Sequence, residues 1–360
     1  MTRSFPLIEV EGPPLERGRA YGRQAGDRIA RGLRLYASSL TSPRLSEIAA
    51  RYLARLAEFD RGLAAEVRGI AEGAEQPVEA IVALNARTEL TAWDAKAVRE
   101  GCTAALAMPR RTADGSLLHG QNWDWRPDCA ETSIVLRILV DNGPDILTFC
   151  EAGQLARHGI NSVGLAVTAN GLQTDHEGSA DGLPSPFARR RILMSQTLAE
   201  ASDVILNTPR SASHNLMLSQ IDGSGRAAAI NFETTPEQLF WSFPTDGLLT
   251  HANHFKHPAA LLSVKDIGLL RHPESLLRDS RAYERLDAGR ASITVDTLKQ
   301  VFADDFGEPH SICRPPAVRP DGSLSATVAS LIMNAGSGDI WIAPSPFDGV
   351  PSYTRYKVAA

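Results

Sequence analysis

Residues 100–105 read EGCTAA and residues 120–125 read GQNWDW, and these two stretches decide how the chain is interpreted. The first places the Cys102 thiol directly after Gly101, where a mostly helical region gives way to a strand-rich one. The second brings the carboxylate of Asp124 between two tryptophans. This layout is typical of a cysteine nucleophile that cuts its own chain and then uses its new amino terminus as a base. The plainer interpretation is that Gly101 ends a helix and Cys102 is a small buried side chain.

The hydrophobic periodicity predicts helices before Cys102 and short strands after it. The expected N-terminal helices cover 15–40, 44–59, 64–72 and a segment that begins at Pro77. The expected strands are 104–108, 117–119, 133–140, 145–150, 160–169, 214–221, 227–232, 238–243, 248–252 and two within 326–343. Further helices are expected over 186–199 and 275–303, and another is expected to begin within 202–208. This order predicts an α+β architecture in which antiparallel sheets lie between helices, formed as one unit.

Composition excludes several classes of protein. The chain carries 37 Lys and Arg against 42 Asp and Glu, a net charge of -5, so a nucleic-acid partner is not expected. No apolar run approaches the length of a transmembrane helix or a signal peptide, and we expect a cytoplasmic protein without a membrane partner. The four cysteines and nine histidines show no metal-ligand spacing, and we expect no metal and no cofactor.

A thiol attacks only as the thiolate, so a base must take its proton. If the bond after Gly101 is cut, the α-amino group of Cys102 becomes that base, and glycine tolerates the bent backbone that cutting requires. Asp124 is a candidate to orient the new amine. The amides of Asn253 and Asn170 are candidate oxyanion donors, and Arg314 is a candidate cation that lowers the thiol pKa or pairs with Asp124.

Six segments taken together resemble the acyl-coenzyme A:6-aminopenicillanic acid acyltransferase (isopenicillin-N acyltransferase) family of N-terminal-nucleophile hydrolases. They are VRGIAEGAEQPVEAIVALNARTEL (67–90), EGCTAA (100–105), GQNWDW (120–125), EAGQLARHGINSVGLAVTAN (151–170), HANHF (251–255) and EPHSICRP (308–315). The resemblance implies a four-layer αββα sandwich with two antiparallel sheets between helical layers. It also implies self-cleavage between Gly101 and Cys102, which gives a helical segment 1–101 and a catalytic segment 102–360 that stay associated.

By the same resemblance, Cys102 is the nucleophile, Asp124 orients its amine, Asn253 serves the oxyanion and Arg314 completes a polar cluster. Asn170 matches a less specific position. The resemblance thus implies an amidohydrolase or acyltransferase that handles a small N-acyl or acyl-thioester compound through a Cys102 thioester.

Four aromatic side chains are candidates for an apolar acyl pocket, and ordinary core packing explains them equally well. They are Trp123, Trp125, Phe187 and Phe255.

Two other hypotheses stay open. In the first, Cys102 and either His251 or His254 form a conventional dyad in an uncut chain. In the second, the chain is a non-catalytic binding protein that keeps the fold.

Overall fold

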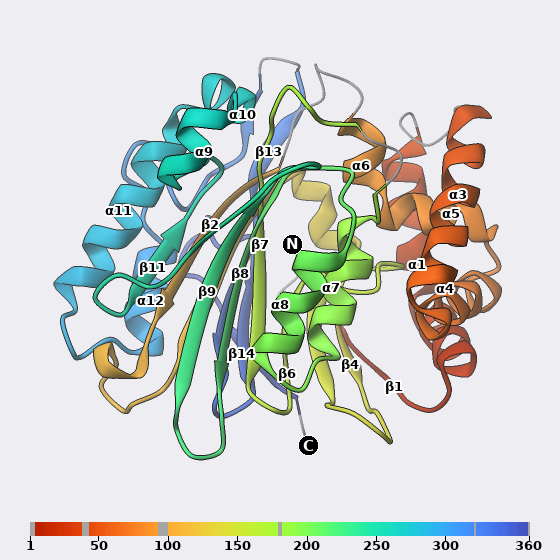
Figure 1. Ribbon diagram of the computed structural model, residues 1–360, viewed down its shortest axis with the longest axis horizontal. Coiled ribbons are helices and arrows are strands. Elements are labelled where there is room, and N and C mark those ends of the chain that lie inside the picture. The colour runs from red at the N-terminus through yellow and green to blue at the C-terminus, as the bar shows by residue number, and fades with distance from the viewer. Residues whose placement is uncertain (1–3, 38–42, 93–99, 179–181, 320–321, 359–360) are drawn as a thin grey trace.

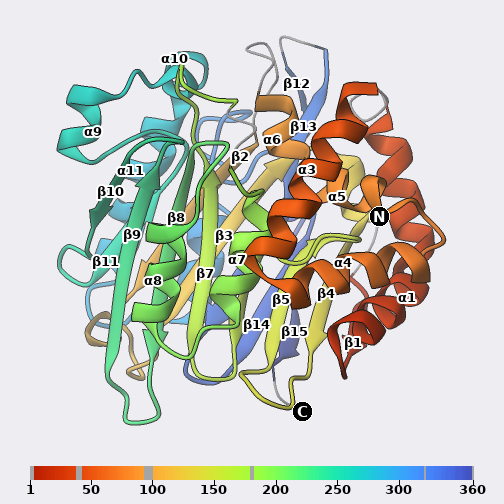
Figure 2. The ribbon, with the colours of Figure 1, turned by 45° about the vertical axis from the view of Figure 1, so that its right-hand side comes forward.

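Two β-sheets stack face to face at the centre of the molecule, and helices cover the outer side of each sheet (Figure 1). The computed structural model describes residues 4–37, 43–92, 100–178, 182–319 and 322–358. Helices α11 and α12 pack on one sheet, whereas α1, α7 and α8 pack on the other (Figures 1 and 2). The predicted α+β fold, a four-layer αββα sandwich, is confirmed.

Within the described residues, the larger sheet has eight strands in the order β1-β4-β5-β6-β7-β8-β9-β10. They are β1 (Leu7–Val10), β4 (Ser133–Ile138), β5 (Ile146–Glu151), β6 (His158–Asn161), β7 (Leu165–Gly171), β8 (His214–Ile221), β9 (Ala227–Thr234) and β10 (Leu239–Ser242). All neighbours are antiparallel except β1 and β4, which run parallel.

The smaller sheet has seven strands within the described residues, in the order β11-β2-β3-β13-β14-β15, with β12 paired to β13. They are β2 (Gly101–Ala107), β3 (Leu118–Trp125), β11 (Leu248–His251), β12 (Ala317–Val318), β13 (Leu324–Asn334), β14 (Asp339–Pro344) and β15 (Thr354–Lys357). All of these pairings are antiparallel.

The N-terminal helices are α1 (Pro14–Leu35), α3 (Pro43–Phe59), α4 (Arg61–Gly73), α5 (Val78–Asn85) and α6 (Arg87–Ala92). The later helices are α7 (Ser185–Leu193), α8 (Leu198–Asn207), α9 (Pro258–Ser263), α10 (Ile267–Arg271), α11 (Glu274–Ala288) and α12 (Val295–Phe302). Short 3-10 helices lie at Pro109–Arg111 and Pro127–Glu131.

The alternation of side chains along β2 and β3 decides which residues lie between the sheets. His119 of β3 contacts Thr168 of the larger sheet through a 2.8 Å Nε2–Oγ1 hydrogen bond, so it points into the space between the sheets. Trp123 lies four residues further along β3 and therefore faces the same way. Cys102 is the cross-strand partner of Trp123, so its thiol also points between the sheets. Asp124, the next residue after Trp123, points to the opposite face.

Small residues let α1 and α4 approach until their backbones touch. A Cβ atom built on Gly18 would lie 2.2 Å from the carbonyl oxygen of Glu66. A Cβ atom on Gly69 would lie 2.2 Å from the carbonyl oxygen of Leu15. Any larger side chain at these positions would push the helices apart, so the glycines set the spacing of the N-terminal helical layer.

The sequence predicted most elements but misplaced several ends. The helix expected over 275–303 is two helices, because Gly289 ends α11 and Thr294 begins α12 with a capping box. The first strand after the helices begins at Gly101 rather than 104. The strands β1 and β15 at the two ends of the chain were not predicted, and residues 38–40 of the first expected helix lie outside the described residues.

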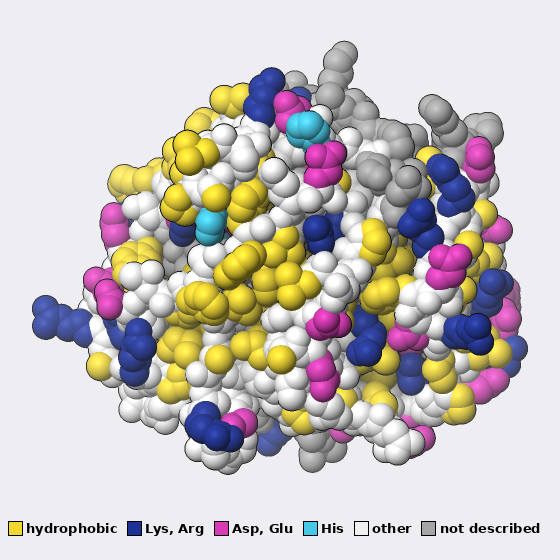
Figure 3. Space-filling view, viewed as in Figure 1, with side chains coloured by type: hydrophobic (Ala, Val, Ile, Leu, Met, Phe, Trp, Pro, Cys, Tyr) yellow, Lys and Arg dark blue, Asp and Glu magenta, His cyan; other side chains and the backbone are white. Residues whose placement is uncertain are grey.

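Residues from both sides of Gly101 share one apolar core, which runs from Phe5 to Val358 and includes Cys102. On the face seen in Figure 3, hydrophobic side chains gather over the region of β8, β9 and α8, where Leu206 is more than half exposed. Among the described residues, none of the helices combines the length and the apolar composition that crossing a bilayer requires.

Replacing Gly18 with Ala should destabilise the protein, because overpacking a tight contact costs about 1–3 kcal/mol. Gly26 of the same helix has nothing within 4 Å of its Cβ position, so Gly26→Ala should stabilise the protein by about 0.4–1 kcal/mol. The measurement is the urea midpoint of each variant against the unmodified protein. Equal midpoints for the two variants would contradict the direct backbone contact of α1 with α4.

Candidate active site

The Gly101–Cys102 peptide lies at the first residues of β2, and its atoms are held by side chains from two other elements. The Cys102 N–H donates to Oδ1 of Asn253 at 2.8 Å, and the Cys102 carbonyl accepts from Nη1 of Arg278 at 2.5 Å. Arg278 also donates to Asn253 Oδ1 at 2.9 Å. Two donors therefore face one atom of the Asn253 amide, and only its oxygen can accept both.

The Asn253 nitrogen consequently faces the other way. Its Nδ2 donates to the carbonyl of Gly171 at 3.0 Å and, at 3.4 Å, to that of Glu100. The expected oxyanion donor thus holds the backbone on both sides of Gly101 in the intact chain. Asn170 is close by on β7, but its Nδ2 donates to the His251 carbonyl at 3.1 Å.

Asp124 and Arg314 meet on the other face of β2, as the sequence suggested. Asp124 is the cross-strand partner of Gly101, and a Cβ atom built on Gly101 would lie 2.9 Å from Asp124 Oδ2. That oxygen is 3.2 Å from Nε of Arg314, and Oδ1 accepts a 2.7 Å hydrogen bond from Thr327. Arg314 also pairs with Glu274 at 3.0 Å. Only glycine fits beside this buried carboxylate without moving it.

The residue before Gly101 anchors a cluster of buried charges. The Glu100 carboxylate pairs with the guanidinium groups of Arg87 and Arg157, and Arg87 pairs in turn with Glu151 at 2.6 Å. Burial by itself would raise the pKa of Glu100, but the two guanidinium groups outweigh burial and hold that pKa well below its usual range. Glu100 is therefore ionised across the physiological pH range.

The Cys102 thiol is not activated in this arrangement. Burial raises the pKa of Cys102 to about 12, and the charges of Glu100 and Asp124 add to the effect, while that of Arg157 opposes it. A thiol with this pKa is fully protonated near neutral pH and is a poor nucleophile. The thiol therefore has to give up its proton before it can attack a carbonyl.

The two candidate dyad histidines have other partners. His251 bonds the carbonyl of Ala252 at 2.9 Å and Oε1 of Glu233 at 3.0 Å. His254 bonds Oγ of Ser275 at 2.7 Å, and the same hydroxyl accepts from the Asn253 N–H. Within the described residues neither ring bonds to Cys102, so both rings buttress the loop that carries Asn253.

The four candidate pocket aromatics lie in different packing environments. Trp123 is fully buried, with its ring against Phe149 and the guanidinium of Arg157 at 4.1 Å from its centroid. Phe187 is fully buried in the same main core, and the partly exposed Trp125 packs against that core. Phe255 lies in a separate small cluster with Leu172 and Ala260. Their role as an acyl pocket stays a prediction.

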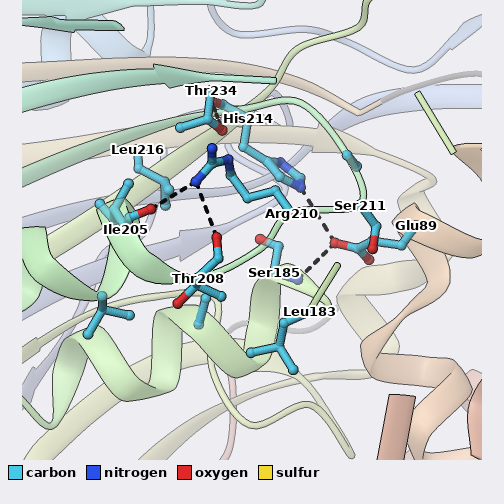
Figure 4. A pocket seen from close by; sticks show the side chains of 13 residues that line it. Glu89, Leu183, Ser185, Ile205, Thr208, Arg210, Ser211, His214, Leu216 and Thr234 are labelled. Atoms are coloured by element: carbon cyan, nitrogen blue, oxygen red, sulfur yellow. Dashed lines mark hydrogen bonds and ion pairs between the residues drawn. The ribbon is translucent and has the colours of Figure 1, made fainter. Parts of the chain in front are cut away.

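Two small cavities lie near this end of the sheets. One is bounded by Gly101, Asn253, Arg278 and Arg314 among others and has a volume of about 10 Å³, enough for one water molecule. The other, of about 30 Å³, lies between α7, α8 and the outer face of the larger sheet, with Glu89 and His214 side by side at one end (Figure 4). Both are much smaller than the usual ligand pocket of about 300–1,000 Å³.

Comparison with known proteins decides the family. Residues 110–342 match the family described as acyl-coenzyme A:6-aminopenicillanic acid acyl-transferase. The chain is 30% identical over 337 residues to the acyl-coenzyme A:6-aminopenicillanic-acid-acyltransferase 40 kDa form of Emericella nidulans, covering 91% of this chain and 89% of that protein. The chain belongs to the acyl-coenzyme A:6-aminopenicillanic acid acyl-transferase family.

Two solved structures that resemble this chain in part are a bile acid hydrolase and a penicillin acylase. A mutant of conjugated bile acid hydrolase from Clostridium perfringens has a TM-score of 0.47 at 12% identity, covering 71% of this chain and 92% of that one. Penicillin V acylase from Agrobacterium tumefaciens has a TM-score of 0.49 at 14% identity, covering 71% and 86%.

The sequence patterns did not indicate Arg278, which donates to the Cys102 carbonyl in the structure. The buried residues of α11 are Ser275, Arg278, Asp279, Ala282 and Leu286. Charged residues at the helical spacing of a buried face were the available signal, because such charges are rarely buried without partners. Thr327 donates a hydrogen bond to Asp124, and no pattern in the sequence around it indicated that role. Within the described residues no three His, Cys, Asp or Glu side chains lie close enough to hold a metal ion.

Replacing Arg314 with Met should strongly destabilise the protein. The change leaves the buried Asp124 carboxylate without its ion-pair partner, and breaking a buried pair in this way costs about 3–5 kcal/mol. The control is Arg226→Met, because Arg226 pairs with Asp222 on the exposed surface and its loss should leave stability almost unchanged. Urea midpoints measure both effects, and similar small losses would show that the Asp124–Arg314 pair contributes nothing.

Proposed function

We propose that this member of the acyltransferase family cuts its own chain between Gly101 and Cys102 and then acts as an N-terminal-cysteine amidohydrolase or acyltransferase. The cut yields segments 1–101 and 102–360, which stay associated because they share one apolar core. The substrate is a small N-acylated compound, and its acyl group passes through a thioester on Cys102.

The hydrogen bond from the Cys102 N–H to Asn253 carries this proposal. An N-terminal nucleophile needs its amine held beside its own side chain, and here the future amine is already held by a buried acceptor. Arg278 fixes that acceptor, and Asp124 lies against Gly101 on the opposite face. These contacts support a backbone prepared for cutting at this one bond.

The self-cleavage step involves the Cys102 thiol, the Gly101 carbonyl and one water molecule. The Cys102 thiol gives up its proton as its sulfur attacks the Gly101 carbonyl carbon, the C–N bond breaks, and the released nitrogen takes up that proton to become the Cys102 amine. Water then attacks the resulting thioester and leaves a Gly101 carboxylate and a free Cys102 thiol. The water-sized cavity beside Gly101 supports access of that water.

Cutting also supplies a base for the Cys102 thiol. The pKa of the Cys102 thiol is about 12 before the cut. A free α-amino group has a pKa of about 7.7–8.0, so near neutral pH it exists partly as a neutral amine that can accept the thiol proton. The thiolate then attacks the substrate carbonyl, and the amine part of the substrate leaves with the proton that the Cys102 amine had taken up. Water or another amine then takes the acyl group from the Cys102 sulfur.

The name of the curated relative bears on the substrate class. The Emericella nidulans protein is named for acyl transfer between acyl-coenzyme A, a thioester, and 6-aminopenicillanic acid, an amine. Such chemistry passes an acyl group between sulfur and nitrogen, and water can replace the amine as acceptor. Amide hydrolysis of a small N-acyl compound is the activity we propose here, with transfer to a second amine as the same chemistry using a different acceptor.

Changing Cys102 to Ala should leave one uncut polypeptide and abolish activity. The matched control is Cys150→Ala, because that thiol is equally buried but lies away from the junction, and this variant should still be cut. Gly101→Ala should slow cutting by displacing Asp124, with which the new Cβ collides. Denaturing gels and N-terminal sequencing measure cutting, and a Cys102→Ala protein that appears as two segments with position 102 at one terminus would falsify the proposal.

The rate of the cut enzyme should fall as pH drops below about 8, because protonation of the Cys102 amine removes the base. A neighbouring carboxylate stabilises the ammonium, so Asp124→Asn should shift this acidic limb of kcat/KM to lower pH. The measurement is a pH profile of kcat/KM for both proteins. A profile with no acidic limb between about pH 6 and 9 would argue against an amine base.

A further inference from the structure

Leucine side chains are exposed on the two short helices α9 and α10. Leu261 and Leu262 of α9 are 60% and 91% exposed, and Leu270 of α10 is 73% exposed. Figure 3 shows hydrophobic side chains at the upper left of the molecule, over the place that α9 and α10 take in Figure 1. A leucine held in water forgoes the gain of burying its apolar surface. Several of them in one short stretch mark a surface that contacts something apolar.

The two helices are fixed to the body of the protein, so loose packing does not explain the exposed leucines. Ala260 of α9 is buried in a small cluster with Leu172 and Phe255. Asp266 caps α10, because its Oδ1 accepts from the Leu269 N–H at 2.7 Å. Its Oδ2 accepts from the Phe255 N–H at 2.8 Å, which ties α10 to the chain before α9. Each helix therefore turns one side to the protein and holds leucine on the other.

The charges of this stretch are mainly positive, although the whole chain has a net charge of -5. Residues 256–272 contain three cations and one carboxylate, which are Lys256, Lys265, Arg271 and Asp266. Asp266 uses both carboxylate oxygens on backbone N–H groups. Lys256 pairs with Asp279 at 2.7 Å, whereas Lys265 is 65% exposed and lies 3.9 Å from Asp175. An exposed pair at that distance is weak, so Lys265 is available to an outside anion.

This composition fits a lipid surface better than a protein partner. Protein interfaces are enriched in aromatic residues and depleted in Lys, and Leu is under-represented among their hot spots. Residues 256–272 contain four leucines and no Phe, Tyr or Trp. Helices that lie on a bilayer combine leucines with Lys and Arg, and anionic headgroups attract those cations. The occupant that the stretch favours is therefore a bilayer with anionic headgroups.

The same stretch borders the candidate active site at both ends. Asn253, which accepts from the Cys102 N–H, lies on the loop between β11 and α9. Glu274, the first residue of α11, pairs with Arg314 at 3.0 Å. A bilayer in contact with α9 and α10 would therefore lie close to the segments that hold Cys102 and Arg314.

We propose that residues 256–272 form a surface that binds bilayers containing anionic lipid. The exposed leucines enter the apolar edge of the bilayer, and Lys265 and Arg271 face its headgroups. The surface then brings the candidate site to N-acyl compounds whose acyl chains are dissolved in the bilayer, and only this last step rests on the proposed function. Short helices bind a bilayer surface without crossing it, so the inference amends the expectation of no membrane partner, which came from the lack of a spanning stretch.

Vesicles of phosphatidylcholine mixed with phosphatidylglycerol are the probe, and sedimentation with the vesicles measures binding. Replacing both Leu262 and Leu270 with Ser should lower the affinity by about tenfold or more, because two apolar side chains no longer enter the bilayer. The matched control replaces Leu206 and Val350 with Ser, which are 54% and 94% exposed on other elements and should not matter. Uncut Cys102→Ala protein should bind as well as the cut protein. An unmodified protein that does not bind, or equal losses in the two double variants, would overturn the surface.

The cations have a separate test. Replacing Lys265 and Arg271 with Gln should lower the affinity for the anionic vesicles by about fivefold for each cation lost, and binding to phosphatidylcholine alone should not change. The control replaces Arg226 and Lys357 with Gln, which are exposed on β9 or β15 or beside them. Unchanged affinity in the Lys265 and Arg271 variant would overturn the preference for anionic lipid.

Sedimentation velocity without lipid tests the other occupant of an exposed apolar surface, a second copy of this chain. The unmodified protein and the Leu262→Ser, Leu270→Ser variant should sediment as species of the same size. A larger species of the unmodified protein that the double variant does not form would overturn the lipid surface in favour of contact between copies.

Turnover separates this inference from the proposed function. On palmitoyl p-nitroanilide dissolved in the vesicles, the cut enzyme should be about tenfold faster than its Leu262→Ser, Leu270→Ser variant, and the two should be equal on water-soluble butyryl p-nitroanilide. Equal rates on the palmitoyl compound would overturn the delivery of substrate from the bilayer. Vesicle binding without any Cys102-dependent hydrolysis would overturn the proposed function and keep the lipid surface, and hydrolysis without vesicle binding would do the reverse.

Discussion

The hydrogen bond between the Cys102 N–H and the Asn253 carboxamide ties the first residues of β2 to the loop after β11. The rest of the site depends on it. Arg278 fixes the orientation of the amide, and Ser275 holds the backbone of Asn253. Because β2 and β11 are adjacent strands, this contact places the Cys102 N–H near a sheet edge, with the Cys102 thiol pointing between the sheets and Asp124 on the opposite face.

Buried charge is the second constraint on this region. Different ion pairs lie on the two faces of β2. On one face, Asp124 is balanced by Arg314. On the other, Glu100 is balanced by Arg157 and Arg87. Charges in a low-dielectric interior are costly unless they are paired, so each of these carboxylates is met by a guanidinium group.

Sequence patterns predicted the layers and the residues that bear the chemistry, because periodicity and short motifs are local properties. Cys102, Asp124 and Arg314 were named in advance, and the structure brings Asp124 and Arg314 together beside Gly101. The short strands β1 and β15 were not predicted, because each is formed by pairing with another strand rather than by a periodic pattern of its own. Arg278 was missed for a similar reason, since its partners lie on β2 and the Asn253 loop.

The sequence by itself determined that a glycine precedes a cysteine at the helix-to-strand transition, that helical and strand-rich regions alternate, and that carboxylate, amide and guanidinium groups are available. Only the tertiary structure decided that the Asn253 oxygen faces the Cys102 amide, that the thiol is buried and protonated, and that Asp124 pairs with Arg314. The reason is physical: hydrogen-bond direction, burial and charge balance depend on distances between segments far apart in the chain, and no local pattern encodes those distances.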